Sequence, residues 1–289
     1  MVQRTPGSAA LITLALTRVP DLPRWIDTRG MLLSARSIVF AQSGPLGADL
    51  VAAVPDAALA SVVGRPPRAT LRNAVVSLDG DVNVLSQMED ADYVAAALAG
   101  WRRQRAIIHV LPEVMPWERE TERGARIFTR QTAPRFDHVP EHLRRELLDA
   151  LNGRTVSRFV PGHLPPATAV VGRITVPMAA VWADGRPVSF CYPVWQTETL
   201  WDVSIETLPA YRRRGLAARA ARTLIRHMRG VGRAPVWGAL ETNAASRALA
   251  ARLGFVETGG IAVFSAAPAM AAKAQASGDR TRTRRRQSL

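Results

Sequence analysis

The sequence predicts a mixed α/β fold, in which a mostly antiparallel, twisted sheet is flanked by helices and preceded by a second, smaller α/β domain. The second half of the chain carries this prediction. Residues 178–183 and 187–195 are apolar runs joined by Asp184-Gly185, which is the pattern of a β-hairpin. Residues 201–207 alternate β-branched and polar side chains as a strand does, and residues 216–228 repeat apolar side chains at helical spacing.

The remaining elements are predicted from the same periodicities, taken in chain order. Predicted strands are 31–42, 50–54, 106–110, 236–240 and one or two within 255–265; predicted helices are an amphipathic segment near 9–17, then 56–63, a periodic stretch from 88 to 108, 141–151 and 243–253. Gly254 ends the last helix, because glycine accepts the left-handed conformation of a C-cap.

A basic turn lies between the strand 201–207 and the helix 216–228. Its residues are Tyr211, three arginines and Gly215, which lacks a Cβ that would keep a ligand away from the backbone. A helix start has free N–H groups and the positive end of the helix dipole, so it suits a pyrophosphate. The alternative is a solvated run of charges, although cations at a helix N-terminus oppose the dipole unless an anion is bound.

Two ordered motifs support the anion site. Arg212-x-x-Gly215-x-Ala217, entered from a strand, resembles the acyl-CoA signature of the GNAT N-acetyltransferase superfamily, Q/R-x-x-G-x-G/A. A second stretch resembles the later strand and helix of that family, and it contains Pro235-Val236-Trp237, Asn243, Ser246, Leu249 and Arg252-Leu253-Gly254-Phe255. The resemblance covers about residues 154–265.

This resemblance implies an acyl-CoA-dependent N-acetyltransferase that uses acetyl-CoA as co-substrate and needs no metal. The pyrophosphate would lie on the backbone N–H groups of residues 212–217, pantetheine would lie along residues 205–207, and an N–H group near Thr207 would hold the thioester oxygen. The cofactor-binding residues implied in this way are Ile205, Glu206, Thr207, Arg212, Arg213, Arg214, Gly215, Leu216, Ala217 and Asn243. Asn243 is equally suited to be an ordinary helix N-cap.

Glu206 is the first candidate for the general base and Glu241 the second. Glu206 lies on the strand beside the expected thioester, and partial burial would raise its pKa; the alternative is an ion pair with a neighbouring arginine. Many GNAT enzymes place a tyrosine in the helix before L-G-F, where this chain has Ala250, so no general acid is assigned. Cys191 is expected to line the core rather than to act as a nucleophile.

Four segments are expected along the 289 residues. Residues 1–111 form an N-terminal α/β domain that packs against the second half and shapes the acceptor site, or is a degenerate copy of the same fold. Residues 112–153 are a linker and a helix, 154–265 the acetyltransferase domain, and 266–289 a disordered basic tail. The arginines of the tail either touch polyanions nonspecifically or only solvate it.

Composition favours a cytoplasmic protein. A single cysteine suits a reducing compartment, and the apolar run near the N-terminus is too short to span a bilayer and has no signal-peptide cleavage site. The arginines behind the net charge of +14 are spread along the whole chain, which indicates a compositional habit rather than a binding face. Nucleic-acid binding is therefore expected only nonspecifically, through the basic tail.

Three functions follow from these observations. The first is acetyl transfer to the primary amine of a small molecule or amino acid. The second is acetylation of a protein or peptide amine. The third is a non-catalytic regulatory module with a GNAT-like fold and a polyanion-binding tail. The acceptor, the acyl chain length and a homodimer are left open, because loops and the other domain set the substrate while the fold sets the donor site.

Overall fold

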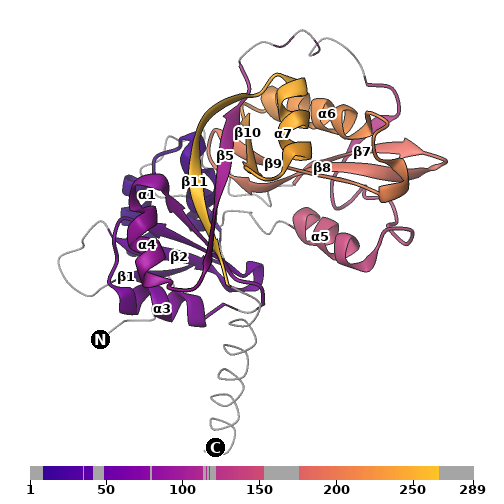
Figure 1. Cartoon of the computed structure of the whole chain (residues 1–289). Coiled ribbons are helices and arrows are strands. Elements are labelled where there is room, and N and C mark those ends of the chain that lie inside the picture. Colours follow the sequence, from indigo (N-terminus) through magenta and orange to yellow (C-terminus); the bar gives the residue numbers. More distant parts are fainter. Residues whose placement is uncertain are drawn as a thin grey trace, which may run out of the picture. The chain divides into compact units, whose positions relative to one another are not determined.

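The computed structural model describes residues 9–34, 36–41, 49–78, 80–112, 115, 117, 122–152 and 176–266 (Figure 1). These residues form two compact units. The first takes its residues from Met1–Val19, Arg36–Ala106 and Gly260–Leu289, and the second from Pro20–Ala35 and Ile107–Gly259. The strands β5 (Arg102–Val110) and β11 (Val256–Ser265) each run from one unit into the other.

The first unit is a small sheet with helices. Its elements are α1 (Ala9–Arg18), β1 (Ile38–Ala41), β2 (Leu50–Val54), β3 (Leu59–Val63), α3 (Arg68–Val76), β4 (Asn83–Gln87) and α4 (Ala91–Ala97). The strands β1, β2 and β3 are antiparallel neighbours, β3 and β4 are parallel, and the last residues of β11 pair antiparallel with β4. Its core includes Leu71, Val84 and Phe264, which are almost fully buried.

The second unit holds the predicted hairpin, basic turn and last helix. Its elements are α2 (Ile26–Leu33), β6 (Ala125–Phe128), α5 (Glu141–Leu151), β7 (Met178–Ala183), β8 (Arg186–Gln196), β9 (Leu200–Thr207), α6 (Leu216–Gly230), β10 (Ala234–Leu240) and α7 (Ala244–Leu253). The strand order is β10-β9-β8-β7-β6, antiparallel except for the parallel pair β9 and β10. The fold class is therefore as predicted.

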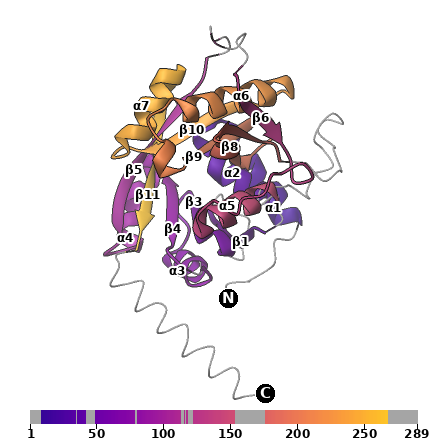
Figure 2. The same ribbon diagram turned by 90° about the vertical axis from the view of Figure 1, so that its right-hand side faces the viewer.

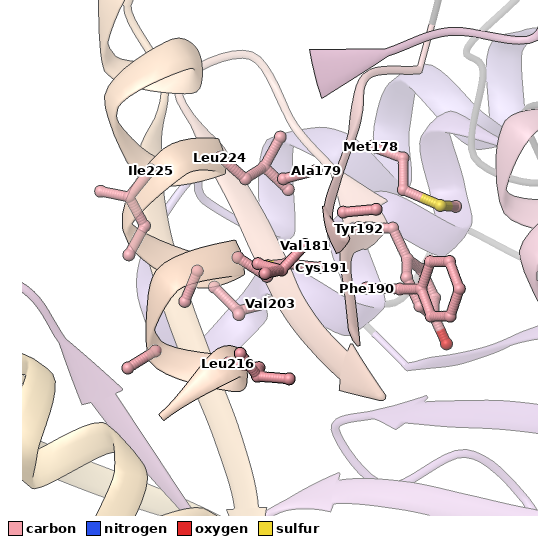
Figure 3. Packing of buried hydrophobic residues seen from close by; sticks show 14 of the residues in the cluster. Met178, Ala179, Val181, Phe190, Cys191, Tyr192, Val203, Leu216, Leu224 and Ile225 are labelled. Atoms are coloured by element: carbon pink, nitrogen blue, oxygen red, sulfur yellow. The ribbon is translucent and has the colours of Figure 1, made fainter. Parts of the chain in front are cut away.

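The two faces of this sheet are covered by different helices. The helix α6 packs on β7, β8 and β9 from one side, and α2 and α5 pack from the other (Figure 2). Figure 3 shows the same division in the side chains. Leu216, Leu224 and Ile225 of α6 lie on the side of Val181, Cys191 and Val203, whereas Phe190 and Tyr192 point away from α6. This alternation follows from the two-residue period of a strand.

Most predicted elements are confirmed, several of them at their bounds. The helix 141–151 is α5, and the strand 50–54 is β2. The hairpin turns at Asp184 and Gly185, both with positive φ. The amphipathic segment near the N-terminus is α1, and residues 106–110 belong to β5. Apart from Ala266, the predicted disordered tail of residues 266–289 lies outside the described residues.

Three predictions in the first half were wrong. Residues 31–33 belong to the helix α2 rather than to a strand, because α2 is buried on almost all sides and a continuous apolar run does not distinguish a helix from a strand. Residues 59–63 form the strand β3 rather than a helix, since pairing with β2 and β4 outweighs the local preference of the alanines. The periodic stretch from residue 88 is helical only to Ala97, and β5 begins at Arg102.

The boundaries of the two units differ from the predicted domain boundaries. Residues 107–153, which the sequence predictions divide between the N-terminal domain and the linker, belong to the second unit together with residues 20–35. Each unit is discontinuous in sequence because the strands β5 and β11 each contribute residues to both units. Composition and linker patterns do not reveal such shared strands, since these patterns describe neighbours in sequence only.

Two carboxyl groups of the second unit lie on the face that α2 covers. Burial raises the pKa of Asp27 in α2 to about 6. Burial also raises the pKa of Asp202 in β9 well above its usual range, and the charge of Asp27 raises it further. Because a like charge disfavours ionisation, the pair holds protons more strongly in the folded protein than in the unfolded chain.

Replacing Asp27 by asparagine is expected to stabilise the protein above pH 6. A carboxyl whose pKa is higher in the folded state than in the unfolded state destabilises the folded state when it ionises. This destabilisation begins near the unfolded pKa of about 3.9, grows as the pH rises, and is complete above the folded pKa. For a partly exposed side chain we expect a gain of about 1–2 kcal/mol at pH 8 and none below pH 4. Melting temperatures of both proteins across this pH range test it. The exposed Asp137→Asn is the control, and an equal gain at pH 4 would contradict the explanation.

Candidate active site

The chain between β9 and α6 is a tight turn that sets arginines beside a helix start. Pro209–Tyr211 forms one 3-10 turn, after which Arg213 and Gly215 have φ angles of 61° and 75°. The left-handed conformation suits Gly215 but costs a residue with a Cβ about 1–2 kcal/mol. Strain of this kind at Arg213 is typical of ligand sites.

The turn is held by its own side chains. The Arg212 Nε donates to the Thr207 oxygen at 3.0 Å, which ties the turn to the end of β9. The Tyr211 hydroxyl donates to Asp184 Oδ2 at 2.9 Å, and the Arg214 guanidinium lies 5.4 Å from the centre of the Tyr211 ring. Side-chain hydrogen bonds therefore hold the turn to the end of β9 through Thr207 and to the β7–β8 hairpin through Asp184.

The first turn of α6 is suited to an anion. Its N-cap, Gly215, has no side chain to accept a hydrogen bond from the helix, and the first turn contains no acidic residue. The first N–H groups of a helix have no partner within the helix, and they lie at the positive end of its dipole. A Cβ added at Gly215 would meet no atom within 4 Å, so the space in front of the backbone is open.

A pocket of about 380 Å³ lies between this turn and α7. Its volume is within the range of small-molecule sites, about 300–1,000 Å³. The lining residues are Thr207, Tyr211, Arg212, Arg213, Gly215, Leu216, Ala217, Ala245, Ala248, Leu249 and Arg252. Six of the residues that the sequence implies for cofactor binding are among them: Thr207, Arg212, Arg213, Gly215, Leu216 and Ala217.

One face of α7 completes the pocket, and no role in the pocket was predicted for its residues from the sequence. Ala245, Ala248, Leu249 and Arg252 follow each other at intervals that place them on a single side of a helix. The two alanines leave room, and Arg252 adds a third cation to those of the turn. The spacing i, i+3, i+4, i+7 was the available signal, although it does not tell which side of the helix meets the pocket.

The second motif mainly positions α7. The Asn243 Oδ1 accepts from the Ser246 N–H at 3.1 Å as an N-cap, and the Ser246 hydroxyl accepts from the Trp237 indole of β10 at 2.9 Å. The Phe255 ring packs edge-on against Trp237, with centroids 5.3 Å apart. Asn243 does not line the pocket, so its contact with a cofactor stays a prediction.

Glu206 lies one residue before the pocket, on the face of β9 opposite α6. Its carboxyl is half-buried, and burial raises its pKa, as does the charge of Glu146 in α5; Arg212 and His142 act in the opposite direction. A carboxyl of this kind is a suitable proton acceptor near neutral pH. The role of Glu206 as general base stays a prediction, and Ile205 points toward the opposite face, which α6 covers.

The remaining sequence candidates are not among the residues that line the pocket. Glu241 is exposed after β10, and Arg214 stacks on Tyr211, so neither is among the lining residues. Ala250 is fully buried in the core, as is Cys191, whose pKa is raised well above its usual range by burial.

The backbone N–H group near Thr207 that would hold the thioester oxygen is a separate question. The Leu208 N–H donates to the Val188 oxygen at 2.9 Å, so this N–H group already has a hydrogen-bond partner.

Comparisons with known proteins assign a family to part of the chain. A family model described as GNAT acetyltransferase matches residues 179–264, which include β8, β9, the basic turn, α6 and α7. Residues 179–264 form a GNAT-superfamily domain. No sequence among the curated proteins matches the chain. The GNAT domain thus contains every residue that lines the pocket.

Solved structures extend the likeness over most of the chain. A GCN5-related N-acetyltransferase-like protein from Streptococcus suis has a TM-score of 0.61 at 14% identity, covering 89% of this chain and 99% of its own. A GNAT-family acetyltransferase from Colwellia psychrerythraea has a TM-score of 0.55 at 11% identity, covering 92% and 99%. A tandem GNAT protein from the clavulanic acid biosynthesis pathway has 0.52 at 14% identity, covering 92% and 98%. Identities this low show the fold alone.

The described residues lack two further kinds of feature. Among them, no three histidine, cysteine, aspartate or glutamate side chains are placed to hold a metal ion. None of the helices in the same part of the chain is long and apolar enough to cross a membrane.

Proposed function

We propose that the GNAT domain binds acetyl-CoA on the turn at residues 212–217 and transfers the acetyl group to a primary amine of a small molecule or amino acid. The observation that carries this proposal is the pocket itself. It joins an uncapped helix N-terminus, three arginine side chains and a surface of small α7 residues. This is the chemistry that a polyanionic pyrophosphate followed by an uncharged pantetheine arm requires.

Acetyl-CoA supplies the thioester carbonyl to which the amine nitrogen adds. In the transfer a C–N bond forms, the C–S bond breaks, and the sulfur leaves with the electron pair and takes a proton from solvent. The chain has to remove one proton from the nitrogen. Glu206 is the proposed acceptor of that proton, directly or through a water molecule, because it directly precedes the pocket-lining Thr207 on β9 and burial raises its pKa.

We also propose a cellular compartment for the protein and a role for its first unit. The one cysteine is buried and free, which suits the reducing conditions of cytoplasm. The likeness to a tandem GNAT protein over 92% of this chain supports the hypothesis that the first unit is a degenerate copy of the fold. The role of the first unit would be to shape the acceptor site. A homodimer is compatible with this role.

A calorimetric titration of acetyl-CoA into the purified chain, followed by thiol release with a panel of amines, tests the proposal. We expect micromolar binding and release of CoA thiol with at least one small primary amine or amino acid. Thiol release only with peptides would favour protein acetylation. Absence of both binding and release would overturn the enzyme hypothesis and favour a non-catalytic module. In that case a salt-sensitive gel shift lost on deletion of residues 266–289 would identify the tail as a polyanion-binding segment.

A further inference from the structure

The face of β8 and β9 that α5 covers carries a row of polar side chains. In the antiparallel register Tyr192 lies opposite Ser204, and Phe190 lies opposite Glu206. Directly opposed residues point to the same face, and so do residues two apart on one strand. Tyr192, Ser204 and Glu206 are therefore neighbours on one face, away from α6.

The helix α5 brings a second carboxylate to this row. Leu143, Leu147 and Leu151 bury one side of α5 in the core of the unit, and Glu146 lies at the margin of that side. The Tyr192 hydroxyl donates to Glu146 Oε1 at 2.7 Å. Because the Tyr192 side chain is only 1% exposed, its hydroxyl depends on this partner and on Ser204.

The hydrogen bond fixes the direction of an otherwise exposed side chain. A glutamate on a helix surface samples many rotamers, and a charge that moves through water has little effect on its neighbours. Tyr192 stays a donor at every physiological pH, since burial and the charge of Glu146 both raise the pKa of its phenol. The Glu146 carboxylate is thus held over the sheet face where Glu206 lies.

The charges around Glu206 act in opposite directions. Glu146 repels its negative charge, while Arg212 from the turn and His142, one helical turn before Glu146 in α5, attract it. The uncharged groups facing it from β8 are Phe190 and Tyr192. Among the charged groups named here, Glu146 is the one that opposes ionisation, and it adds to the effect of burial.

We infer that Glu146 and Tyr192 are positioning residues for the proposed transfer: Tyr192 holds the Glu146 carboxylate near Glu206, and its charge makes Glu206 a stronger proton acceptor. The inference rests on the proposed function, in which Glu206 takes the proton of the amine. It assigns to α5, which lies outside residues 179–264 matched by the family, a part in the proton transfer.

The titration of Glu206 tests the inference without any reaction. Side-chain carbons of glutamate labelled with ¹³C are followed by NMR across pH in the full chain, and the Glu206 signal is assigned by its loss in Glu206→Gln. In Glu146→Gln, which keeps an oxygen to accept from Tyr192, Glu206 is expected to titrate at lower pH than in the wild type. Tyr192→Phe, which releases Glu146, is expected to shift it in the same direction by less.

Two further variants separate charge from packing. Glu146→Asp keeps the charge and should restore most of the wild-type titration. Glu141→Gln removes an exposed carboxylate of the same helix that pairs with Arg144 and Arg145, and it should leave the Glu206 titration unchanged. An unchanged Glu206 titration in a folded Glu146→Gln protein, or an equal shift in Glu141→Gln, would overturn the inference.

The same variants give a kinetic readout. The acidic limb of the pH profile of kcat/KM should move to lower pH in Glu146→Gln, because the base then loses its proton more easily. Failure of the proposed function would appear elsewhere, as absence of thiol release from the wild type with every amine. The NMR titration remains decisive for the pairing of the two carboxylates in that case.

Discussion

Replacing Gly215 by glutamate is expected to abolish acetyl-CoA binding, with a loss of at least about 100-fold in affinity. The new carboxylate would stand in the open space before the first turn of α6, where the pyrophosphate is proposed to lie. Bringing an anion into that position repels the ligand and occupies the helix N–H groups. A calorimetric titration at low salt measures the loss, and 100-fold corresponds to about 2.7 kcal/mol.

The matched control is Gly215→Gln. Position 215 has a φ of 75°, so either side chain strains the backbone by about 1 kcal/mol, and the difference between the two variants isolates the charge. Glutamine is expected to weaken binding much less than glutamate. Equal binding by the wild type and Gly215→Glu would move the acyl-CoA site away from this turn.

Replacing Glu206 by glutamine is expected to slow acetyl transfer by about 10²–10⁴-fold, which is the usual contribution of a positioned general base. Glutamine has nearly the same shape but accepts no proton from an ammonium group. Acetyl-CoA affinity should change little, since the pocket is lined by the backbone and side chains of the turn and α7 rather than by the Glu206 carboxyl. Thiol release under saturating amine measures the rate, and calorimetry measures the affinity.

The pH dependence gives this prediction a second check. If Glu206 is the base, the wild-type rate rises as the pH passes upward through its raised pKa, and the residual rate of Glu206→Gln lacks that limb. Glu241→Gln is the comparison variant, because Glu241 was the second candidate and lies exposed outside the pocket. A larger loss in Glu241→Gln than in Glu206→Gln would exchange the roles of the two residues.

Part of the site could be predicted from local sequence. The strand β9, the basic turn and α6 follow one another within 31 residues, from Leu200 to Gly230, so their periodicities and the glycine at the N-cap indicate both the elements and the free helix N-terminus. The same holds for Asn243, whose cap of α7 depends on a residue three positions away. Interactions across a few residues leave a pattern that can be read along the chain.

Other parts depended on tertiary structure. Residues 31–33 were predicted as strand and residues 59–63 as helix, and both predictions were wrong because burial and strand pairing decided the conformation. The α7 face of the pocket was missed because periodicity does not tell which side of a helix meets a ligand.

The sequence by itself determined the fold class and the basic turn, because both are encoded in short patterns of apolar, glycine and charged residues. Only the tertiary structure decided which carboxylates act together. Tyr192 and Glu146 are 46 residues apart, and their hydrogen bond exists because α5 docks on β8 and the register of β8 and β9 sets Tyr192 beside Ser204. The physical reason is that a long-range contact depends on how two elements pack, and packing is a property of the whole core rather than of either segment.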